Sequence, residues 1–409
     1  MSAVSLPRPK RGALFDITRP EFKADPFPYL AEWRAKQPIV KVKAGMLEAW
    51  LVTRYDDVLS VLKDPRFSKE LRKVQDAEGA PKFWMPEFVR VLEQNMLDQD
   101  DPNHARLRGL VHKAFTPRRI EQLQPRIEAI AGELLDAVRP HSSMDLVRDF
   151  ALPLPLTVIA ELLGVPLADR DRFHRWSGAV LQTPTAFNLA KAIPTLWTFI
   201  RYLRRQLAQR RAEPRDDLLT ALVQAEEAGD RLSENEAVAM VILLLIAGHE
   251  TTVNLIASGT LALLQQRDQW DLLRARPELM KSAIEELVRF ANPVETATER
   301  YAGEDLELAG QQIKRGELVL AGLASANRDP AYFSRPDLLD ITREKNRHLG
   351  FGMGIHFCLG APLARMEAQI ALGALQSRLP DLRLAVPAET LRWRATPIVR
   401  GLAALPVRW

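Results

Sequence analysis

The chain has 409 residues, 47% of them hydrophobic and 26% charged, a balance typical of a folded globular protein and not of a disordered or fibrous one. Lys and Arg number 56 against 52 Asp and Glu, and the resulting net charge of +4 is too small to indicate nucleic-acid binding. The single cysteine, Cys358, excludes an intramolecular disulfide, a four-cysteine zinc site and a cysteine-ligated iron–sulfur cluster, and it favours a reducing cytoplasmic location.

The N-terminal segment, residues 1–24, contains basic side chains but no apolar stretch long enough for a signal peptide or membrane anchor. We expect it to form a loose leader. The sequence of residues 25–409 contains no pattern typical of a flexible linker, a low-complexity tract or an internal repeat. We therefore expect one large domain over residues 25–409, and a monomer.

Secondary-structure signals change in type along the chain. Alternating apolar residues predict short strands at 38–45 and 49–55. Apolar residues three and four apart then predict helices through most of 102–288. Brief strands separated by turn residues follow over 297–322. The pattern predicts a mainly α fold with small β sheets.

The longest apolar run, residues 237–248, is shorter than the roughly 20 residues that cross a bilayer. Ser233 and Glu236 have capping-box spacing just before it, and good helix formers continue to about Gln265. We predict a buried core helix and no membrane span. The polar residues that interrupt it at 249–252 must either have hydrogen-bond partners or serve a function.

Cys358 lies at the beginning of a predicted helix, with Pro362 in the first turn. Backbone N–H groups and the helix dipole at this position favour a thiolate, which is a metal ligand. Glycines at 350, 352, 354 and 360 leave room for a flat, bulky cofactor, and haem is such a cofactor.

Three other interpretations of Cys358 remain open when the cysteine is considered alone. It could be a small buried hydrophobe, which is the commonest state of a free cysteine. It could join His348 and His356 in a zinc site, or act as a nucleophile with His356 as its base. The zinc and nucleophile interpretations leave the glycines unexplained.

Residues 351–360, FGMGIHFCLG, resemble the haem-binding loop of the cytochrome P450 family and match its Phe-Gly-x-Gly-x-His-x-Cys-x-Gly pattern at every defined position. Three further motifs occur in the order that this family requires, so the resemblance covers residues 25–409. It implies the cytochrome P450 fold. It also implies haem b, iron protoporphyrin IX, bound through the Cys358 thiolate.

The first companion motif is a pair of ionic residues, Glu286 and Arg289, which are three apart and share one helix face. They resemble the family's Glu-x-x-Arg pair, which implies a buried ion network completed by the segment 326–330. An ordinary surface pair is the alternative.

The second companion motif lies at residues 247–252. Ala247 and Gly248 provide room over a haem face, and Thr251 lies one turn after Ala247. The resemblance implies that Thr251 and Glu250 deliver protons towards dioxygen. A polar patch with a threonine bonded back to the helix is the alternative.

The third companion motif supplies contacts to the haem. His104 and Arg108 share one helix face and resemble the family's contacts to the haem propionates, although Asn103 stands where relatives often carry an acidic residue. For each cation, a solvated surface position is the alternative. The resemblance extends the expected haem contacts to Arg300, Phe351, Gly352, His356 and Gly360.

The resemblance implies a haem-thiolate monooxygenase that hydroxylates or epoxidises a hydrophobic small molecule, using O2 and two electrons from separate partners. We expect ferredoxin and ferredoxin reductase, with NAD(P)H as the ultimate donor. A hydrogen-peroxide-driven peroxygenase and a non-catalytic ligand binder or sensor are the alternatives. The acid and alcohol of Glu250 and Thr251 favour the monooxygenase.

Segments expected at the substrate pocket are mainly apolar, which favours a fatty acid, terpenoid or polyketide. They include a helical region at 181–197. Basic residues near the cysteine side of the haem could dock an acidic electron donor, and they are Lys113, Arg118, Lys345 and Arg347. The residues expected to line the substrate pocket are Phe83, Trp84, Leu243, Leu244, Val294, Thr296 and Ile398.

Overall fold

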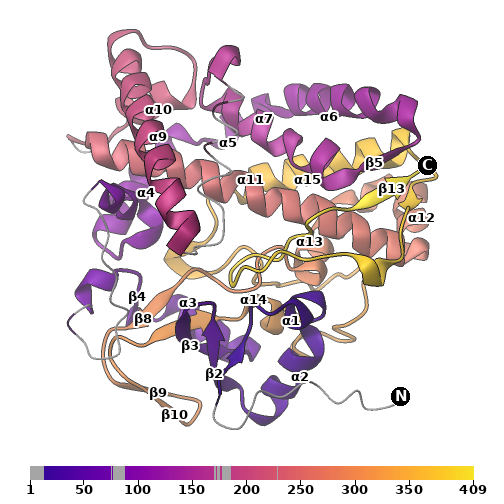
Figure 1. Cartoon of the computed structure of the whole chain (residues 1–409), viewed down its shortest axis with the longest axis horizontal. Coiled ribbons are helices and arrows are strands. Elements are labelled where there is room, and N and C mark those ends of the chain that lie inside the picture. The colour runs from indigo at the N-terminus through magenta and orange to yellow at the C-terminus, as the bar shows by residue number, and fades with distance from the viewer. Residues whose placement is uncertain are drawn as a thin grey trace.

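The structure is a computed structural model that describes residues 13–74, 76, 88–169, 172, 176, 186–227 and 229–409. Helices form most of it, with small sheets gathered on one side, as the sequence predicts (Figure 1). The long helix α11 (Glu234–Gln265) runs through the middle of the helical part. Around it pack α7 (Pro153–Leu162), α9 (Ala186–Ala212), α13 (Met280–Ala291) and α15 (Ala361–Arg378).

Helix α11 begins where the sequence predicts, because Ser233 and Glu236 form a capping box. Its 32 residues make a helix of about 48 Å. By length and composition it could cross a membrane, but 67% of its most apolar window is buried inside the fold. A helix that is apolar on nearly all sides finds partners on every side here, as expected of a core helix.

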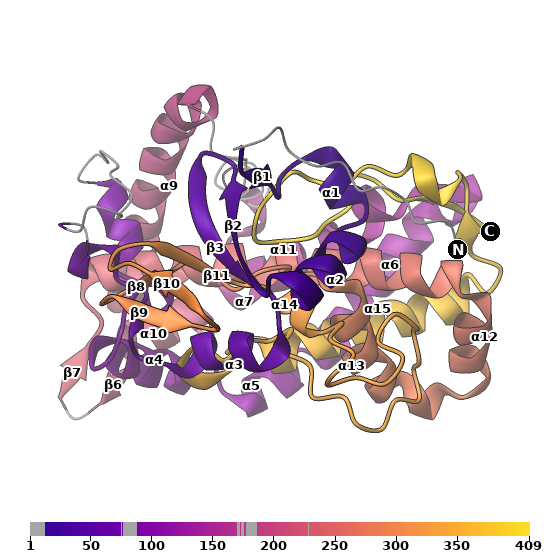
Figure 2. The same cartoon turned by 90° about the horizontal axis from the view of Figure 1, so that it is seen from below.

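The main sheet has six strands in the order β1-β2-β3-β11-β8-β4. Strands β2 (Ile39–Ala44) and β3 (Leu47–Val52) form an antiparallel hairpin, and β11 (Leu318–Ala321) runs parallel to β3 with Leu320 opposite Leu51. These strands confirm the alternation seen in the sequence. Figure 2 shows the hairpin beside α2 (Phe27–Lys36), and Figure 1 shows it on the opposite side of the molecule from α6 (Gln124–Val138) and α15.

The expected leader needs a correction from residue 13 onwards. Strand β1 (Phe15–Asp16) pairs with β2, and α1 (Pro20–Ala24) follows it. Phe15 and Phe22 are buried, and the Lys23 ammonium is fully buried against Glu295. The segment belongs to the domain because its apolar side chains pack into the core, although its strand is too short to give an alternation signal. Residues 1–12 lie outside the described part.

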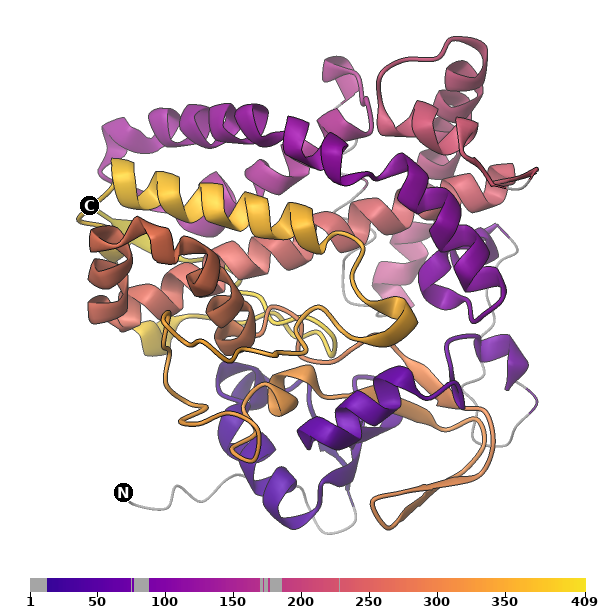
Figure 3. The same ribbon diagram turned by 180° about the vertical axis from the view of Figure 1, so that it is seen from behind.

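Helix α15 connects the loop that carries Cys358 to the rest of the helical part. The helix follows directly on the cysteine loop and then runs between α6 (Gln124–Val138) and α11, as Figure 3 shows from behind. Among the described residues, the other α-helices are α3 (Tyr55–Lys63), α4 (Asn103–Ala114), α5 (Pro117–Gln122), α10 (Leu218–Gln224), α12 (Arg267–Ala275) and α14 (Leu323–Ala326). The other strands are β4 (Phe67–Ser68), β5 (Ser143–Asp145), β6 (Glu226–Glu227), β7 (Asp230–Arg231), β8 (Arg300–Ala302), β9 (Leu306–Leu308), β10 (Gln311–Ile313), β12 (Arg383–Leu384) and β13 (Pro406–Arg408).

Candidate active site

A cavity with about 1440 Å3 of empty space, its open mouth included, lies between α11 and the cysteine loop, residues 350–360. Helix α4 and the segment 293–300 complete its walls. Four parts of the chain that are far apart in sequence therefore meet at one space, and each of them carries a motif that the sequence singled out.

Cys358 lies on the wall of this cavity, just before the first turn of α15. Its backbone N–H donates to the Phe351 carbonyl at 2.9 Å, which closes the loop. Burial raises the pKa of the thiol, and the backbone N–H groups of Gly360 and Ala361 together with Arg108 act against this rise. The helix N-terminus alone therefore does not ionise the thiol, whereas a metal ion bonded to the sulfur would.

The glycines of the loop serve two purposes. Gly350, Gly352 and Gly360 line the cavity, as expected for close approach of a flat group. Gly354 does not line it. It has a φ of 76°, and a Cβ there would lie 2.8 Å from the Leu62 carbonyl oxygen. Gly354 is needed for the packing of the loop on α3, and not to make room for a cofactor.

Four cationic or ionisable side chains line one edge of the cavity: His104, Arg108, Arg300 and His356. The rings of His104 and His356 are 4.4 Å apart, and the His104 Nε2 atom is buried without a hydrogen-bond partner. Burial lowers the pKa of Arg300 to about 10 and, with help from His104, Lys69 and Arg300, that of His356 to about 3. Such a cluster is suited to an anionic group inside the cavity.

Helix α11 presents a threonine to the cavity and a carboxyl away from it. Ala247, Gly248 and Thr251 line the cavity, and the Thr251 hydroxyl donates to the Ala247 carbonyl at 2.8 Å. Glu250 does not line it. Its Oε1 lies 3.2 Å from the Nη1 atom of Arg394, and burial raises the pKa of Glu250 while Arg394 opposes that rise.

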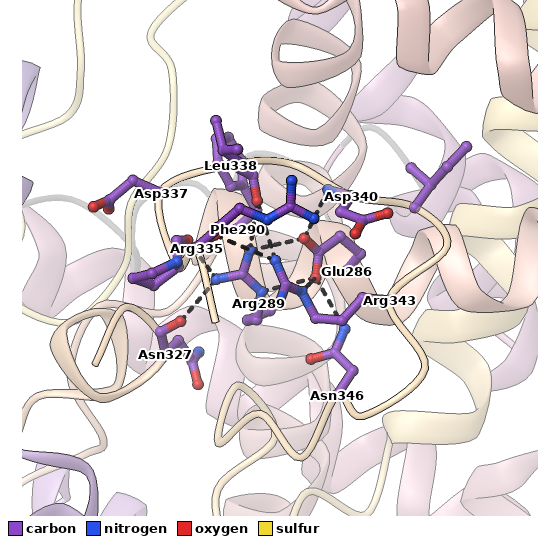
Figure 4. Close-up of polar contacts among 12 residues, drawn as sticks. Glu286, Arg289, Phe290, Asn327, Arg335, Asp337, Leu338, Asp340, Arg343 and Asn346 are labelled. Atoms are coloured by element: carbon purple, nitrogen blue, oxygen red, sulfur yellow. Dashed lines mark hydrogen bonds and ion pairs between the residues drawn. The ribbon is translucent and has the colours of Figure 1, made fainter. Parts of the chain in front are cut away.

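Behind the cysteine loop, Glu286 and Arg289 form a fully buried ion pair with two contacts of 2.7 Å (Figure 4). Arg289 also donates to the Asn327 carbonyl at 2.9 Å, so the segment 326–330 completes the network. Arg343 approaches Glu286 at 3.0 Å, and the Asp340 backbone N–H donates to it at 2.9 Å. The structure places this pair in the core, and not on the surface.

The expected substrate residues separate into three groups. Leu243, Leu244 and Val294 line the cavity. Thr296 and Ile398 do not and need a correction, because the chain bends after Val294 and brings Ala297 and Thr298 to the wall instead. The Thr296 hydroxyl donates to the Pro397 carbonyl, and the Ile398 carbonyl accepts from the Glu295 backbone N–H. Thr296 and Ile398 therefore lie behind the wall. Phe83 and Trp84 lie outside the described residues.

Several wall residues carry no motif, and only the fold brings them together: Met96, Leu97, Phe115, Ile159, Leu255 and Leu323. A buried acid was also missed. Glu367, nine residues after the cysteine, is buried in α15, and burial raises its pKa to about 8 against the opposing hydrogen bond of Thr252. A single glutamate between apolar residues of the predicted helix was the available signal.

Comparison with known proteins places the chain in a family. A sequence model of cytochrome P450 matches residues 261–379. Polyketide biosynthesis cytochrome P450 PksS of Bacillus subtilis is 44% identical over 95% of this chain and 96% of its own length. Cytochrome P450 monooxygenase PikC of Streptomyces venezuelae is 45% identical over 95% of this chain and 92% of its own length.

Solved structures of cytochromes P450 resemble this chain over nearly its whole length. The structure of PksS covers 97% of this chain and 99% of its own, with a TM-score of 0.90 at 43% identity. That of the myxobacterial cytochrome P450 CYP267B1 with myristic acid covers 96% and 98%, with a TM-score of 0.88 at 44% identity.

The residues around the cavity fit a haem. A sulfur atom is available as a metal ligand, apolar side chains and small residues make the walls, and the buried Arg300 together with Arg108, His104 and His356 offers positive charge and N–H groups that the carboxylates of a haem would need. The chain therefore belongs to the cytochrome P450 family, and it is a haem-thiolate monooxygenase.

Proposed function

We propose that Cys358 would bind the haem iron through its sulfur atom. His104, Arg108, Arg300 and His356 would hold its propionates, because these four side chains line the cavity close to one another. When bound, the haem supplies the chemistry that reductively activates dioxygen and inserts one oxygen atom into the substrate. The observation that carries the proposal is the convergence of the Cys358 sulfur, two arginines, two histidines and the Thr251 hydroxyl on one cavity.

The protein's own part in the reaction includes the proton supply. The Thr251 hydroxyl faces the cavity and can pass its proton to a group there, in place of the hydrogen bond to Ala247. Glu250 is the adjacent residue, and it reaches Arg394, whose side chain is 33% exposed. The position of Thr251 at the cavity and the contact of the neighbouring Glu250 with a partly exposed cation support a role for both residues in proton delivery.

The substrate is proposed to be a polyketide or a long-chain acyl compound. The wall formed by Ile159, Leu243, Leu244 and Leu255 is apolar, which suits such a molecule. Among the relatives, PksS is named for polyketide biosynthesis, and the mycinamicin IV hydroxylase/epoxidase of Micromonospora griseorubida is 46% identical. Another relative was solved with an acyl carrier protein that bears hexadec-9Z-enoic acid.

The electron donors are proposed to be a ferredoxin and its reductase, acting on a monomeric enzyme in the cytoplasm. Lys113, Arg118, Lys345 and Arg347 are all exposed, and an acidic ferredoxin could be steered to them. Charge reversal at Arg118 and Lys345 should then reduce electron transfer more strongly at low salt than at high salt.

The ligand proposal is tested by absorbance spectroscopy. The reduced protein with carbon monoxide should show the Soret band of sulfur-ligated haem, and Cys358→Ala should lose that band. If the variant keeps it, Cys358 is not the ligand. Macrolides and fatty acids added to the oxidised protein should shift the haem absorbance when they bind in the cavity.

The proton role is tested with Thr251→Ala. We expect product formed per NADPH consumed to fall by about tenfold or more, because proton delivery becomes inefficient. Thr260→Ala is the matched control, since the Thr260 hydroxyl makes the same kind of bond to Ile256 on α11, away from the cavity. Full turnover with hydrogen peroxide alone and none with ferredoxin would favour the peroxygenase instead.

A further inference from the structure

Glu250 has one charged partner among the described residues, and it comes from the far end of the chain. The Arg394 guanidinium contacts the buried carboxylate at 3.2 Å from a position 144 residues away. Two other titratable groups lie nearby and have other partners: His249 on α11 contacts the Leu245 carbonyl, and Glu367 on α15 contacts the Thr252 hydroxyl. Arg394 is therefore the group that compensates Glu250.

Arg394 belongs to the hairpin segment 393–402, which packs behind the cavity wall. Within the segment, the Arg394 backbone N–H donates to Gly401 at 2.9 Å, and Trp393 pairs with Leu402. The guanidinium of Arg400 lies 3.7 Å from the centre of the Trp393 ring. The base of the hairpin segment, which carries Arg394, is thus held by both backbone and side-chain contacts.

The other side of the hairpin segment holds the wall itself. Val399 bridges to Val294, and the Arg400 backbone N–H donates to the Pro293 carbonyl at 3.0 Å. Pro293 and Val294 line the cavity. A substrate that displaces Pro293 and Val294 would therefore also displace the hairpin segment, which carries Arg394.

We propose that Arg394 is a positioning residue for Glu250: its guanidinium contact keeps the carboxyl group turned away from the cavity, and the hairpin segment loosens that contact when Pro293 and Val294 are displaced. The inference rests on the proposed role of Glu250 in proton supply. A buried carboxylate that loses its only cation takes up a proton, because burial disfavours the charged form. Proton loading of Glu250 would then follow occupation of the cavity.

The experiment measures the protonation of Glu250 directly by infrared titration of the haem-bound protein. The difference between the spectra of the wild type and Glu250→Gln isolates the Glu250 carboxyl band. Arg394→Gln should raise the midpoint of that band by about one pH unit or more, and Arg394→Lys should leave it near the wild-type value. Arg392→Gln is the control, because Arg392 is exposed and directly precedes the hairpin segment.

The link to the wall is tested with Val294→Phe, which overfills the wall without a ligand. The midpoint of Glu250 should rise in this variant and should not rise further when Val294→Phe is combined with Arg394→Gln. An unchanged midpoint in Val294→Phe overturns the link through the hairpin segment. An unchanged midpoint in Arg394→Gln, equal to that of Arg392→Gln, overturns the positioning role.

The proposed function and this inference can fail separately. If Glu250→Gln keeps the wild-type product yield per NADPH while Arg394→Gln moves the midpoint of Glu250, the ion pair positions the acid and the acid is not the proton donor. If the yield falls in Glu250→Gln and the midpoint does not move in Arg394→Gln, the proton role stands and Arg394 is only a neighbour.

Discussion

Two glutamates lie buried on neighbouring helices of the core, Glu286 on α13 and Glu367 on α15, with exposed fractions of 0% and 2%. Glu286 is held by two guanidinium groups and a backbone N–H. Glu367 has one hydroxyl, that of Thr252, and its Oε2 atom has no partner. Equal burial therefore comes with different compensation: cations surround Glu286, whereas burial without a compensating cation raises the pKa of Glu367.

The largest effect is expected at Glu286. Glu286→Gln leaves Arg289 and Arg343 buried without their anion, which should cost about 3–5 kcal/mol of folding stability. Urea unfolding of the haem-bound protein measures this loss. Glu344→Gln, on an exposed residue next to Arg343, should change nothing measurable. A cost below about 1 kcal/mol at Glu286 would contradict the view that this network holds the loop behind the site.

An intermediate effect of the opposite kind is expected at Glu367. Its pKa is raised to about 8, so the folded protein keeps a proton that the unfolded chain releases above its ordinary pKa of 4.5. Wild-type stability should therefore fall as the pH rises from about 4.5 to about 8.

Glu367→Gln removes this titration, and the variant should gain stability over the wild type with rising pH, by about 4 kcal/mol at pH 8. Thermal unfolding between pH 5 and pH 8 follows the gain, with the exposed Glu389→Gln as control. A gain that is the same at every pH would show that Glu367 is not protonated in the folded protein.

A smaller effect with the reverse pH dependence is expected at Glu285. Burial alone would raise the pKa of this group, but hydrogen bonds from Arg365 at 2.6 and 2.8 Å and from His348 outweigh it and lower the pKa to about 2. Its contribution is present above the unfolded value of 4.5 and is lost as the pH falls towards about 2.

Glu285→Gln should therefore cost about 1 kcal/mol at pH 7, a modest amount because the side chain is 31% exposed. The cost should shrink below about pH 4.5, which urea unfolding at a series of pH values can follow. With rising pH, Glu285→Gln should become more destabilising, whereas Glu367→Gln should become more stabilising. Equal pH trends in the two variants would refute the comparison.

Local patterns in the sequence were enough for the cysteine loop, the long helix that begins after Ser233, and the main strands. Each of these depends on residues close together along the chain, whose spacing already expresses the physical requirement. The same holds for Glu286 and Arg289, which lie one turn apart on α13. The fold and the reaction class followed from such motifs.

Tertiary structure alone decided which buried carboxyl groups have a cation as partner and which residues reach the cavity. The partner of Glu250 lies 144 residues away, and Thr296 and Ile398 lie behind the wall because of a bend that no local pattern marks. Residues 13–24 join the domain through contacts with a sheet and with Glu295. Burial and charge compensation are properties of the space around a side chain, and that space is built from segments that the chain brings together only on folding.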